Sequence, residues 1–352
     1  MDRVKLTIHA LAVETDSEAT ILQAAEQAGI DIPRLCHHPE LSQRGGCRLC
    51  VVEVQANRVL SAACVTPVSE GMVVETESAA VVKARQTILE LLLANHPPNC
   101  IICDKQGECK LSEYCYRYGV TDTQFKGIQP HYPVEHSDPF IIRDRNKCIL
   151  CGACVRACEE LTGQDNLTFI GRSFHNKVGT AGDRPYIDSN CVFCGQCVAV
   201  CPVGALTEKS MAGRGRRWEF DRVRTTCPFC GTGCNFDLAV KNSEIVGVLS
   251  NPESPVNGSS LCVKGRFGWD YIYHEKRLTK PLIKRQGSFA ATSWDEAFDL
   301  IAQRFNEVKD QHGPEAFAAL SSARCTNEEN YLIQKFTRGY MGSNNVDHCA
   351  RT

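Results

Sequence analysis

The chain has 352 residues, of which 43% are hydrophobic and 23% charged, and a net charge of -2. These values are those of a globular protein of two or three domains and give no sign of a nucleic-acid partner. The unusual feature is 22 cysteines, which follow a start at Met1 without a secretory signal. No apolar stretch is long enough to span a membrane, and a disulfide scaffold of this length is not expected. In a reducing cytoplasm so many cysteines are metal ligands, so we predict a cytoplasmic metalloprotein.

Residues 1–78 open with the strand-like alternation of Val4, Leu6 and Ile8, followed by a short amphipathic helix from Ser17 to Gly29. Four cysteines then occur in the pattern C-x10-C-x2-C-x13-C: Cys36, Cys47, Cys50 and Cys64. A strand is expected at 51–54. A glycine-lined loop, a close cysteine pair and a distant fourth thiolate predict a β-grasp domain with one 2Fe-2S cluster. The segment resembles the N-terminal ferredoxin domain of the iron–sulfur subunit of NADH dehydrogenase and of [FeFe] hydrogenases.

Residues 79–119 are predicted to hold a second cluster. Apolar residues recur every three or four positions from 78 to 95, which predicts a helix that ends at His96. Three cysteines follow: Cys100, Cys103 and Cys109. Chemistry alone leaves His96 and Cys115 as equal candidates for the fourth ligand of a 4Fe-4S cluster. The resemblance to the two families just named favours His96, a neutral ligand that is expected to raise the cluster's potential.

Residues 138–209 carry an internal repeat, after a connecting loop at 120–140. The two runs have the spacing C-x2-C-x2-C-x3-C: Cys148, Cys151, Cys154 and Cys158, then Cys191, Cys194, Cys197 and Cys201. This is the pattern of two-cluster ferredoxins, in which the fourth cysteine of each run serves the other cluster. We therefore predict that Cys201 completes the first 4Fe-4S site and Cys158 the second. A double zinc ribbon does not require these spacings.

Five arginines occur between residues 209 and 226. A solvated linker is the simpler interpretation. Contact with a partner subunit or with cofactor phosphates is the alternative, and the sequence does not decide between them.

Residues 220–275 contain one more set of four cysteines, followed at once by Lys264 and Gly265: Cys227, Cys230, Cys234 and Cys262. Four thiolates fit a further 4Fe-4S cluster, and zinc is the alternative.

Residues 276–352 lack a cysteine pattern of this kind and instead carry helix and strand signals. Ser293 and Thr326 each begin a sequence typical of a capping box, and the helices they start are expected to end near Gly313 and Gly342. A buried strand is expected at 316–320. Helix, strand and helix predict the start of an α/β domain, so the whole chain is α+β and multidomain.

Four segments together resemble the molybdenum- or tungsten-dependent formate dehydrogenases, whose NAD(P)- or ferredoxin-linked subunits carry the same five-cluster extension. The segments are 227–234, 262–265, 321–331 and 344–351. The resemblance implies one 2Fe-2S cluster, four 4Fe-4S clusters and, in a full-length protein, Mo or W held by two molybdopterin guanine dinucleotides. It also implies that Lys264 lies between the last cluster and a pterin.

The family's metal ligand comes two residues after the arginine that corresponds to Arg351, which is position 353, directly after Thr352. We therefore expect a selenocysteine there, encoded by UGA, and a domain that continues. No catalytic residue is expected within 1–352. A codon at 353 other than UGA or a cysteine codon would contradict this expectation.

The function predicted from these patterns is the electron-transfer half of a formate dehydrogenase or CO2 reductase. The expected partners are flavin and iron–sulfur subunits that bind NAD(P), ferredoxin, or hydrogenase subunits, with formate or CO2 as substrate. The alternatives are an iron–sulfur subunit of a hydrogenase or of an NADH dehydrogenase-like complex, and a non-catalytic electron carrier.

Overall fold

The computed structural model describes residues 2–126 and 129–349. The chain divides into two compact units. The first unit comprises residues 1–223, 237–250 and 259–266, and the second comprises residues 224–236, 251–258 and 267–352. The chain crosses between the units within β10 (Asp221–Thr226) and β11 (Asn235–Lys241) and again within α6 (Val263–Phe267).

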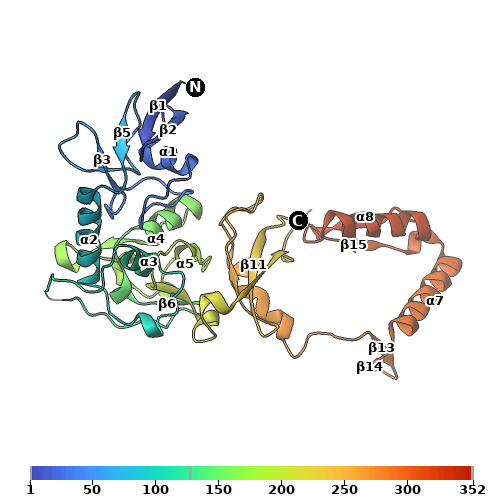
Figure 1. Cartoon of the computed structure of the whole chain (residues 1–352). Coiled ribbons are helices and arrows are strands. Elements are labelled where there is room, and N and C mark those ends of the chain that lie inside the picture. The colour runs from blue at the N-terminus through green and yellow to red at the C-terminus, as the bar shows by residue number, and fades with distance from the viewer. Residues whose placement is uncertain (1, 127–128, 350–352) are drawn as a thin grey trace. The chain divides into compact units, whose positions relative to one another are not determined.

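The first unit begins with a five-stranded sheet packed on one short helix (Figure 1). Its elements are β1 (Arg3–Ile8), β2 (Leu11–Asp16), α1 (Ile21–Gln27), β3 (Val51–Val54), β4 (Ser61–Ala62) and β5 (Val73–Glu75). The strand order is β2-β1-β5-β3-β4, with β1 and β5 parallel and the other neighbours antiparallel. This arrangement confirms the predicted β-grasp domain.

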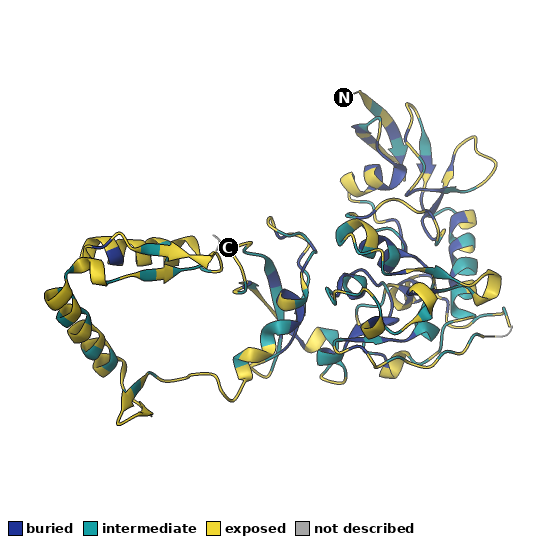
Figure 2. Cartoon of the chain, turned by 180° about the vertical axis from the view of Figure 1, so that it is seen from behind, coloured by how far each residue is buried: buried dark blue, intermediate teal, exposed yellow. Residues whose placement is uncertain are grey.

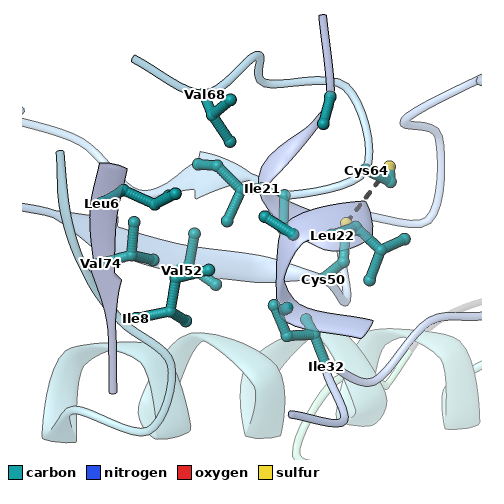
Figure 3. Packing of buried hydrophobic residues seen from close by; sticks show 14 of the residues in the cluster. Leu6, Ile8, Ile21, Leu22, Ile32, Cys50, Val52, Cys64, Val68 and Val74 are labelled. Atoms are coloured by element: carbon teal, nitrogen blue, oxygen red, sulfur yellow. Dashed lines mark hydrogen bonds between the residues drawn. The ribbon is translucent and has the colours of Figure 1, made fainter. Parts of the chain in front are cut away.

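The core of the β-grasp domain lies between this sheet and α1 (Figure 3). Ile8, Ile21 and Leu22 are fully buried there. The helix starts at Ile21 and not at Ser17 as expected, because Thr20 forms a capping box with Gln23. The capping box sets the first turn and orients the apolar face of α1 toward the sheet.

Two helices follow in the first unit: α2 (Ala79–Leu93) and α3 (Lys110–Arg117), separated by a 3-10 turn at Cys100–Ile102. Helix α2 begins close to the predicted start at residue 78, where the Ser78 side chain accepts from the N–H of Val81. On α2, the guanidinium of Arg85 is fully buried. Its Nη1 donates to Glu77 Oε1 at 2.8 Å and to the Tyr118 hydroxyl at 2.7 Å, and Nη2 donates to the carbonyl of Val51 at 2.9 Å. Arg85 thus ties the β-grasp sheet to the segment around α3.

Replacing Arg85 by methionine should destabilise the N-terminal part of the first unit by roughly 2–4 kcal/mol, because it leaves the buried Val51 carbonyl without its donor and removes one of the partners of Glu77 and of the Tyr118 hydroxyl. The matched control is Arg117→Met. Arg117 also pairs with Glu77, but its side chain is 37% exposed, so the expected loss is below about 1 kcal/mol. Denaturant unfolding of the anaerobic holoprotein, followed by visible absorbance, measures both. Equal losses in the two variants would contradict this assignment.

Residues 138–211 form a region of very short elements. They are β6 (Ile141–Arg143), α4 (Ala153–Arg156), β7 (Thr168–Ile170), β8 (Lys177–Gly179), α5 (Gln196–Ala199) and β9 (Leu206–Glu208). β6 pairs with β9 and β7 with β8, each antiparallel. Because these helices and strands have only three or four residues each, the region has little regular structure of its own around its cysteines.

The arginine-rich stretch is largely exposed, but its side chains also contact other segments of the chain. Within the first unit, Arg217 and Arg222 both pair with Glu108, and Arg214 pairs with Glu244. The Trp218 ring lies so close to Gly107 that a Cβ at Gly107 would come within 2.4 Å of it. The stretch is therefore packed against the loop between Cys103 and Cys109, and these cations are paired with carboxylates of the chain itself.

The remaining strand of the first unit is β12 (Glu244–Leu249), which pairs antiparallel with β11. The second unit contains a hairpin, two longer helices and a parallel strand pair. Its elements are β13 (Leu282–Arg285), β14 (Ser288–Ala291), α7 (Trp294–His312), β15 (Ala319–Ser321), α8 (Asn327–Lys335) and β16 (Val346–His348). The strand predicted at 316–320 begins at Ala319 and is shorter than expected, and the prediction that it is buried is wrong, since Leu320 is 84% exposed.

Both predicted helix starts in the second unit are present. Thr326 forms a capping box with Glu329, whereas Ser293 caps α7 without the reciprocal bond. Helix α7 is only partly covered, since Phe298 is 58% exposed, and α7 and α8 are mostly yellow in Figure 2. Its Phe305 ring packs on Phe317 and Phe336, with ring centroids 5.0 Å and 6.2 Å apart. No helix among the described residues is long and apolar enough to cross a membrane.

Candidate functional site

The four cysteines predicted to hold the 2Fe-2S cluster lie in two close pairs at the edge of the β-grasp core. The Sγ atoms of Cys50 and Cys64 are 3.4 Å apart (Figure 3), and the backbone N–H of Cys47 donates to Cys36 Sγ at 3.4 Å. Hydrogen bonds from Cys47 and Cys64 lower the pKa values of Cys36 and Cys50 respectively. The same hydrogen bonds raise the pKa values of Cys47 and Cys64. Each pair therefore favours one thiolate, the form that binds iron, beside one thiol.

This loop packs directly on the region of the first cysteine run. Cys36 and Leu41 share a buried cluster with Cys151 and Ala157. The guanidinium of Arg44 also stacks on the Phe169 ring, 4.4 Å from its centroid. The candidate 2Fe-2S loop and the candidate loop of the first 4Fe-4S cluster are therefore neighbours within the first unit.

Cys100, Cys103 and Cys109 also lie together. Burial raises the pKa of the Cys109 thiol, and the nearby Cys103 and Cys100 contribute to the rise. His96 Nδ1 is buried and has no hydrogen-bond partner among the described residues, as a nitrogen reserved for a metal would be. Cys115, the alternative ligand, is also buried and close to Cys109, and burial raises its pKa to about 11. The assignment of His96 stays a prediction, supported by its unpaired nitrogen.

Replacing His96 by alanine should therefore remove about four irons per chain, whereas Cys115→Ser should keep the full iron content. The reason is that only the first substitution removes a ligand. Iron and sulfide analysis of anaerobically purified protein measures the difference. Loss of iron from Cys115→Ser together with retention in His96→Ala would reverse the assignment.

The repeat in residues 148–201 surrounds two cavities. The first is lined by one crossed set of cysteines: Cys148, Cys151, Cys154 and Cys201. The second is lined by the other set: Cys158, Cys191, Cys194 and Cys197. Each cavity thus takes three cysteines from one run and the fourth from the other run, which is the crossed arrangement expected from the spacing. The ligand assignment stays a prediction that these cavities support.

Tyr186 lines both cavities, and no sequence pattern indicated it. It is 1% exposed, and its hydroxyl has no hydrogen-bond partner among the described residues. The guanidinium of Arg143 lies 4.4 Å from the centre of its ring. Tyr186 is therefore the wall that the two candidate cluster sites share.

Burial disfavours ionisation of the cysteine thiols around these cavities. Burial raises the pKa of Cys151 to about 12 and those of Cys148 and Cys191 to about 11. A bound cation reverses this cost, because a coordinating thiol is deprotonated outright. The buried donor sets therefore fit iron–sulfur clusters. Among the described residues, no three His, Cys, Asp or Glu side chains converge closely enough to hold a single metal ion.

The segment that contains His96 and Cys103 lies beside the first cavity, in close contact with Gly204. A Cβ at Gly204 would lie 2.6 Å from Cys103 Sγ, and the N–H of Lys110 donates to the carbonyl of Pro202 at 2.9 Å. Since Pro202 directly follows Cys201, the two candidate sites are adjacent.

The last cysteine set is divided between the units. Cys227, Cys230 and Cys234 lie on a tight loop of the second unit, where the N–H of Cys227 donates to the carbonyl of Cys234 at 2.8 Å. Cys262 belongs to the first unit and immediately precedes α6. Lys264 is exposed on α6.

Two of the segments that carry the resemblance lie side by side in the second unit. β15 and β16 are parallel, with Ser321 opposite His348. Just beyond the strands, Ser322 Oγ and Cys349 Sγ are 3.3 Å apart. In open α/β sheets, ligands bind at the carboxyl ends of the strands.

The expected position of the metal ligand, directly after Thr352, is not tested by the structure. Thr352 lies outside the described residues, as does Arg351, the arginine from which that position was counted. The selenocysteine at position 353 therefore stays a prediction.

The cysteine loop of the second unit also reaches the strand ends. A Cβ at Gly231 would lie 2.3 Å from the carbonyl oxygen of Ala323, so only glycine permits the observed approach. The candidate cluster loop and the carboxyl ends of β15 and β16 are thus in direct contact.

Family models match five successive segments of the chain. They are a 2Fe-2S iron-sulfur cluster binding domain (1–79), an NADH-ubiquinone oxidoreductase-G iron-sulfur binding region (85–124), an NADH-quinone oxidoreductase subunit 3 ferredoxin-like domain (138–207), a molybdopterin oxidoreductase Fe4S4 domain (220–274) and a molybdopterin oxidoreductase domain (277–352). The chain thus matches iron–sulfur domains over most of its length and the start of a molybdopterin oxidoreductase domain at 277–352. These domains indicate iron–sulfur clusters and a molybdopterin as cofactors.

The curated relatives that the chain matches have different names. An NADPH-Fe(3+) oxidoreductase subunit alpha of Geobacter sulfurreducens is 38% identical over 99% of the chain and 40% of its own length. An NADH-quinone oxidoreductase subunit of Rhizobium meliloti is also 38% identical, over 99% and 40%. A putative formate dehydrogenase of Staphylococcus aureus is 32% identical, over 91% and 36%. The chain thus spans about 40% of the length of the curated relatives it matches.

A solved structure, that of NAD+-reducing [NiFe]-hydrogenase in the H2-reduced state, contains a chain that is 34% identical, with a TM-score of 0.56. The likeness covers 60% of this chain and 90% of that one. The chain is therefore similar to subunits of NADH-type and hydrogenase complexes.

Proposed function

We propose that the chain is the electron-transfer half of a formate dehydrogenase or CO2 reductase catalytic subunit. In this proposal one 2Fe-2S and four 4Fe-4S clusters pass electrons between a Mo- or W-bispterin site and a partner linked to NAD(P) or ferredoxin. The observation that carries the proposal is the contact of Gly231 with Ala323, which brings a cluster loop against the carboxyl ends of β15 and β16. An electron relay requires this proximity between a cluster and a redox site.

The residues of the chain have defined roles in the proposal. When bound, the bispterin metal supplies two-electron chemistry with formate, and the clusters supply single-electron transfer. The crossed cysteines bind the two central clusters and limit the access of water to them, because each of these side chains is buried or half-buried. Lys264, two residues beyond Cys262 in the sequence, is the cation that the resemblance implies between the last cluster and a pterin.

Formate as the substrate is supported by the resemblance of 321–331 and 344–351 and by the relatives named putative formate dehydrogenases. The second candidate is an electron-transfer subunit of an NADPH- or NADH-linked complex, favoured by the two relatives at 38% identity and by the likeness to the hydrogenase chain. In that case the partner subunits, and not formate, deliver the electrons.

The test is a metal, pterin and electron-donor analysis of the full-length protein, purified anaerobically from its own cells. We expect Mo or W and two pterin guanine dinucleotides per chain, with formate bleaching the cluster absorbance in the absence of any other subunit. Iron without Mo, W or pterin, and bleaching only when NAD(P)H and partner subunits are added, would favour the second candidate.

A further inference from the structure

Arginines from distant segments donate to the backbone carbonyls of three predicted ligand cysteines. Arg156 donates to the carbonyl of Cys36, Arg216 to that of Cys103 at 3.1 Å and Arg266 to that of Cys194 at 2.9 Å. The partners are 120, 113 and 72 residues apart in sequence, and all six residues belong to the first unit. The same type of contact therefore recurs at three different candidate cluster sites.

Arg266 is the most completely enclosed of the three. It is 1% exposed. Besides the bond from its Nε to Cys194, its Nη2 donates to Gln196 Oε1 at 2.7 Å and to Ser250 Oγ at 2.8 Å. Its Nη1 lies 3.7 Å from a carboxylate oxygen of the buried Glu208. Four groups thus hold the guanidinium in one orientation against the Cys194 loop.

Arg266 also contacts the next candidate ligand through its backbone. Its N–H donates to the carbonyl of Cys262 at 3.0 Å, at the start of α6. A single residue therefore touches the ligand loops of two predicted clusters, through its side chain at Cys194 and through its main chain at Cys262.

The guanidinium of Arg266 is bonded directly to the Cys194 loop, through Nε at 2.9 Å from the Cys194 carbonyl oxygen. The carboxylate that pairs with it, Glu208, also faces the cations Arg217 and Lys105. Three cations therefore share one buried carboxylate beside this ligand loop.

We propose that Arg266 is a positioning residue that holds the Cys194 ligand loop and raises the reduction potential of the cluster bound by Cys158, Cys191, Cys194 and Cys197. This inference rests on the proposed iron–sulfur function. Reduction adds one negative charge to a cluster, and hydrogen bonds and nearby charge set its potential. A fixed guanidinium in a dry site stabilises the reduced form, because Coulomb interactions are screened less there than in water.

The experiment is an EPR-monitored redox titration of the full-length holoprotein carrying Arg266→Gln. The signal of this cluster is assigned as the one lost in Cys194→Ser. We expect the equilibrium constant for its reduction to fall about tenfold, which is 59 mV for a one-electron couple. Arg214→Gln is the matched control, since it removes the same charge from a side chain that is 51% exposed and pairs with Glu244.

Two further variants separate charge from folding. Arg266→Lys keeps the charge and should restore most of the potential. The double variant Arg266→Gln with Glu208→Gln leaves no buried carboxylate unpaired at this position and should still lower the potential. Selective loss of this one cluster from both neutral variants, with the 2Fe-2S signal intact, would support the positioning role.

The proposal would be overturned if the equilibrium constant for reduction of this cluster in Arg266→Gln lay within threefold of that in Arg214→Gln. It would also be overturned if Arg266→Lys failed to restore the potential of the unsubstituted protein. If the unsubstituted protein assembles no 4Fe-4S cluster at all, the proposed function itself is wrong. That outcome is distinct from a normal set of clusters whose potentials do not depend on Arg266.

Discussion

Removal of the iron–sulfur clusters is expected to unfold residues 138–211 while the β-grasp sheet stays folded. The α-helices and strands in this region have three or four residues each, and its two cavities are walled by cysteines, so the clusters supply the interior that side chains do not. Bound metal in small domains contributes folding free energy on the order of 10 kcal/mol. The apolar core around Ile8, Ile21 and Leu22 does not depend on iron to the same extent.

Hydrogen exchange followed by mass spectrometry, on the full-length protein before and after anaerobic chelation of iron, measures this effect. Amides of β6, β9, α4 and α5 should lose their protection, and those of β1 and β2 should keep most of it. Unchanged protection of β6 and β9 in iron-free protein would show that the cysteine region has a stable core of its own.

The second large effect concerns the crossed ligands. Cys201→Ser should remove the cluster of the first run, about four irons per chain, because Cys201 lines the cavity with Cys148, Cys151 and Cys154. Its EPR spectrum should therefore match that of Cys151→Ser. Cys158→Ser should instead match Cys194→Ser, since Cys158 lines the other cavity.

The control for these variants is Cys325→Ser, which changes a half-buried cysteine that has no predicted ligand role. It should retain all of the roughly eighteen irons that one 2Fe-2S and four 4Fe-4S clusters contain. A Cys201→Ser spectrum that matches Cys194→Ser would show that each run serves its own cluster.

Features encoded by local spacing could be predicted from the sequence. The crossed cysteine sets follow from the two repeated runs, and the helix starts at Ser78 and Thr326 follow from side chains that bond within three residues. The order of the domains also follows from the cysteine patterns.

Features created by long-range contacts could not be predicted in this way. Arg156, Arg216 and Arg266 lie 72 to 120 residues from the carbonyls they bind, and Tyr186 has no cysteine pattern around it that indicates a shared wall. The sequence left the role of the arginines at 214–222 open for the same reason, because their carboxylate partners, such as Glu108, lie on other segments. The helical periodicity of α7 likewise marks an apolar face but does not say which surface would cover it.

The central claim is that the cluster domains form one electron path from the strand ends of β15 and β16 to the N-terminal 2Fe-2S domain. Its most direct test is to add formate to the full-length protein without other subunits and to record the 2Fe-2S EPR signal after rapid freezing. We predict that formate reduces the 2Fe-2S cluster as completely as its potential allows. The claim would be contradicted if the 2Fe-2S cluster stayed oxidised after formate was added to protein that contains Mo or W. The control is that dithionite reduces the 2Fe-2S cluster of the same sample.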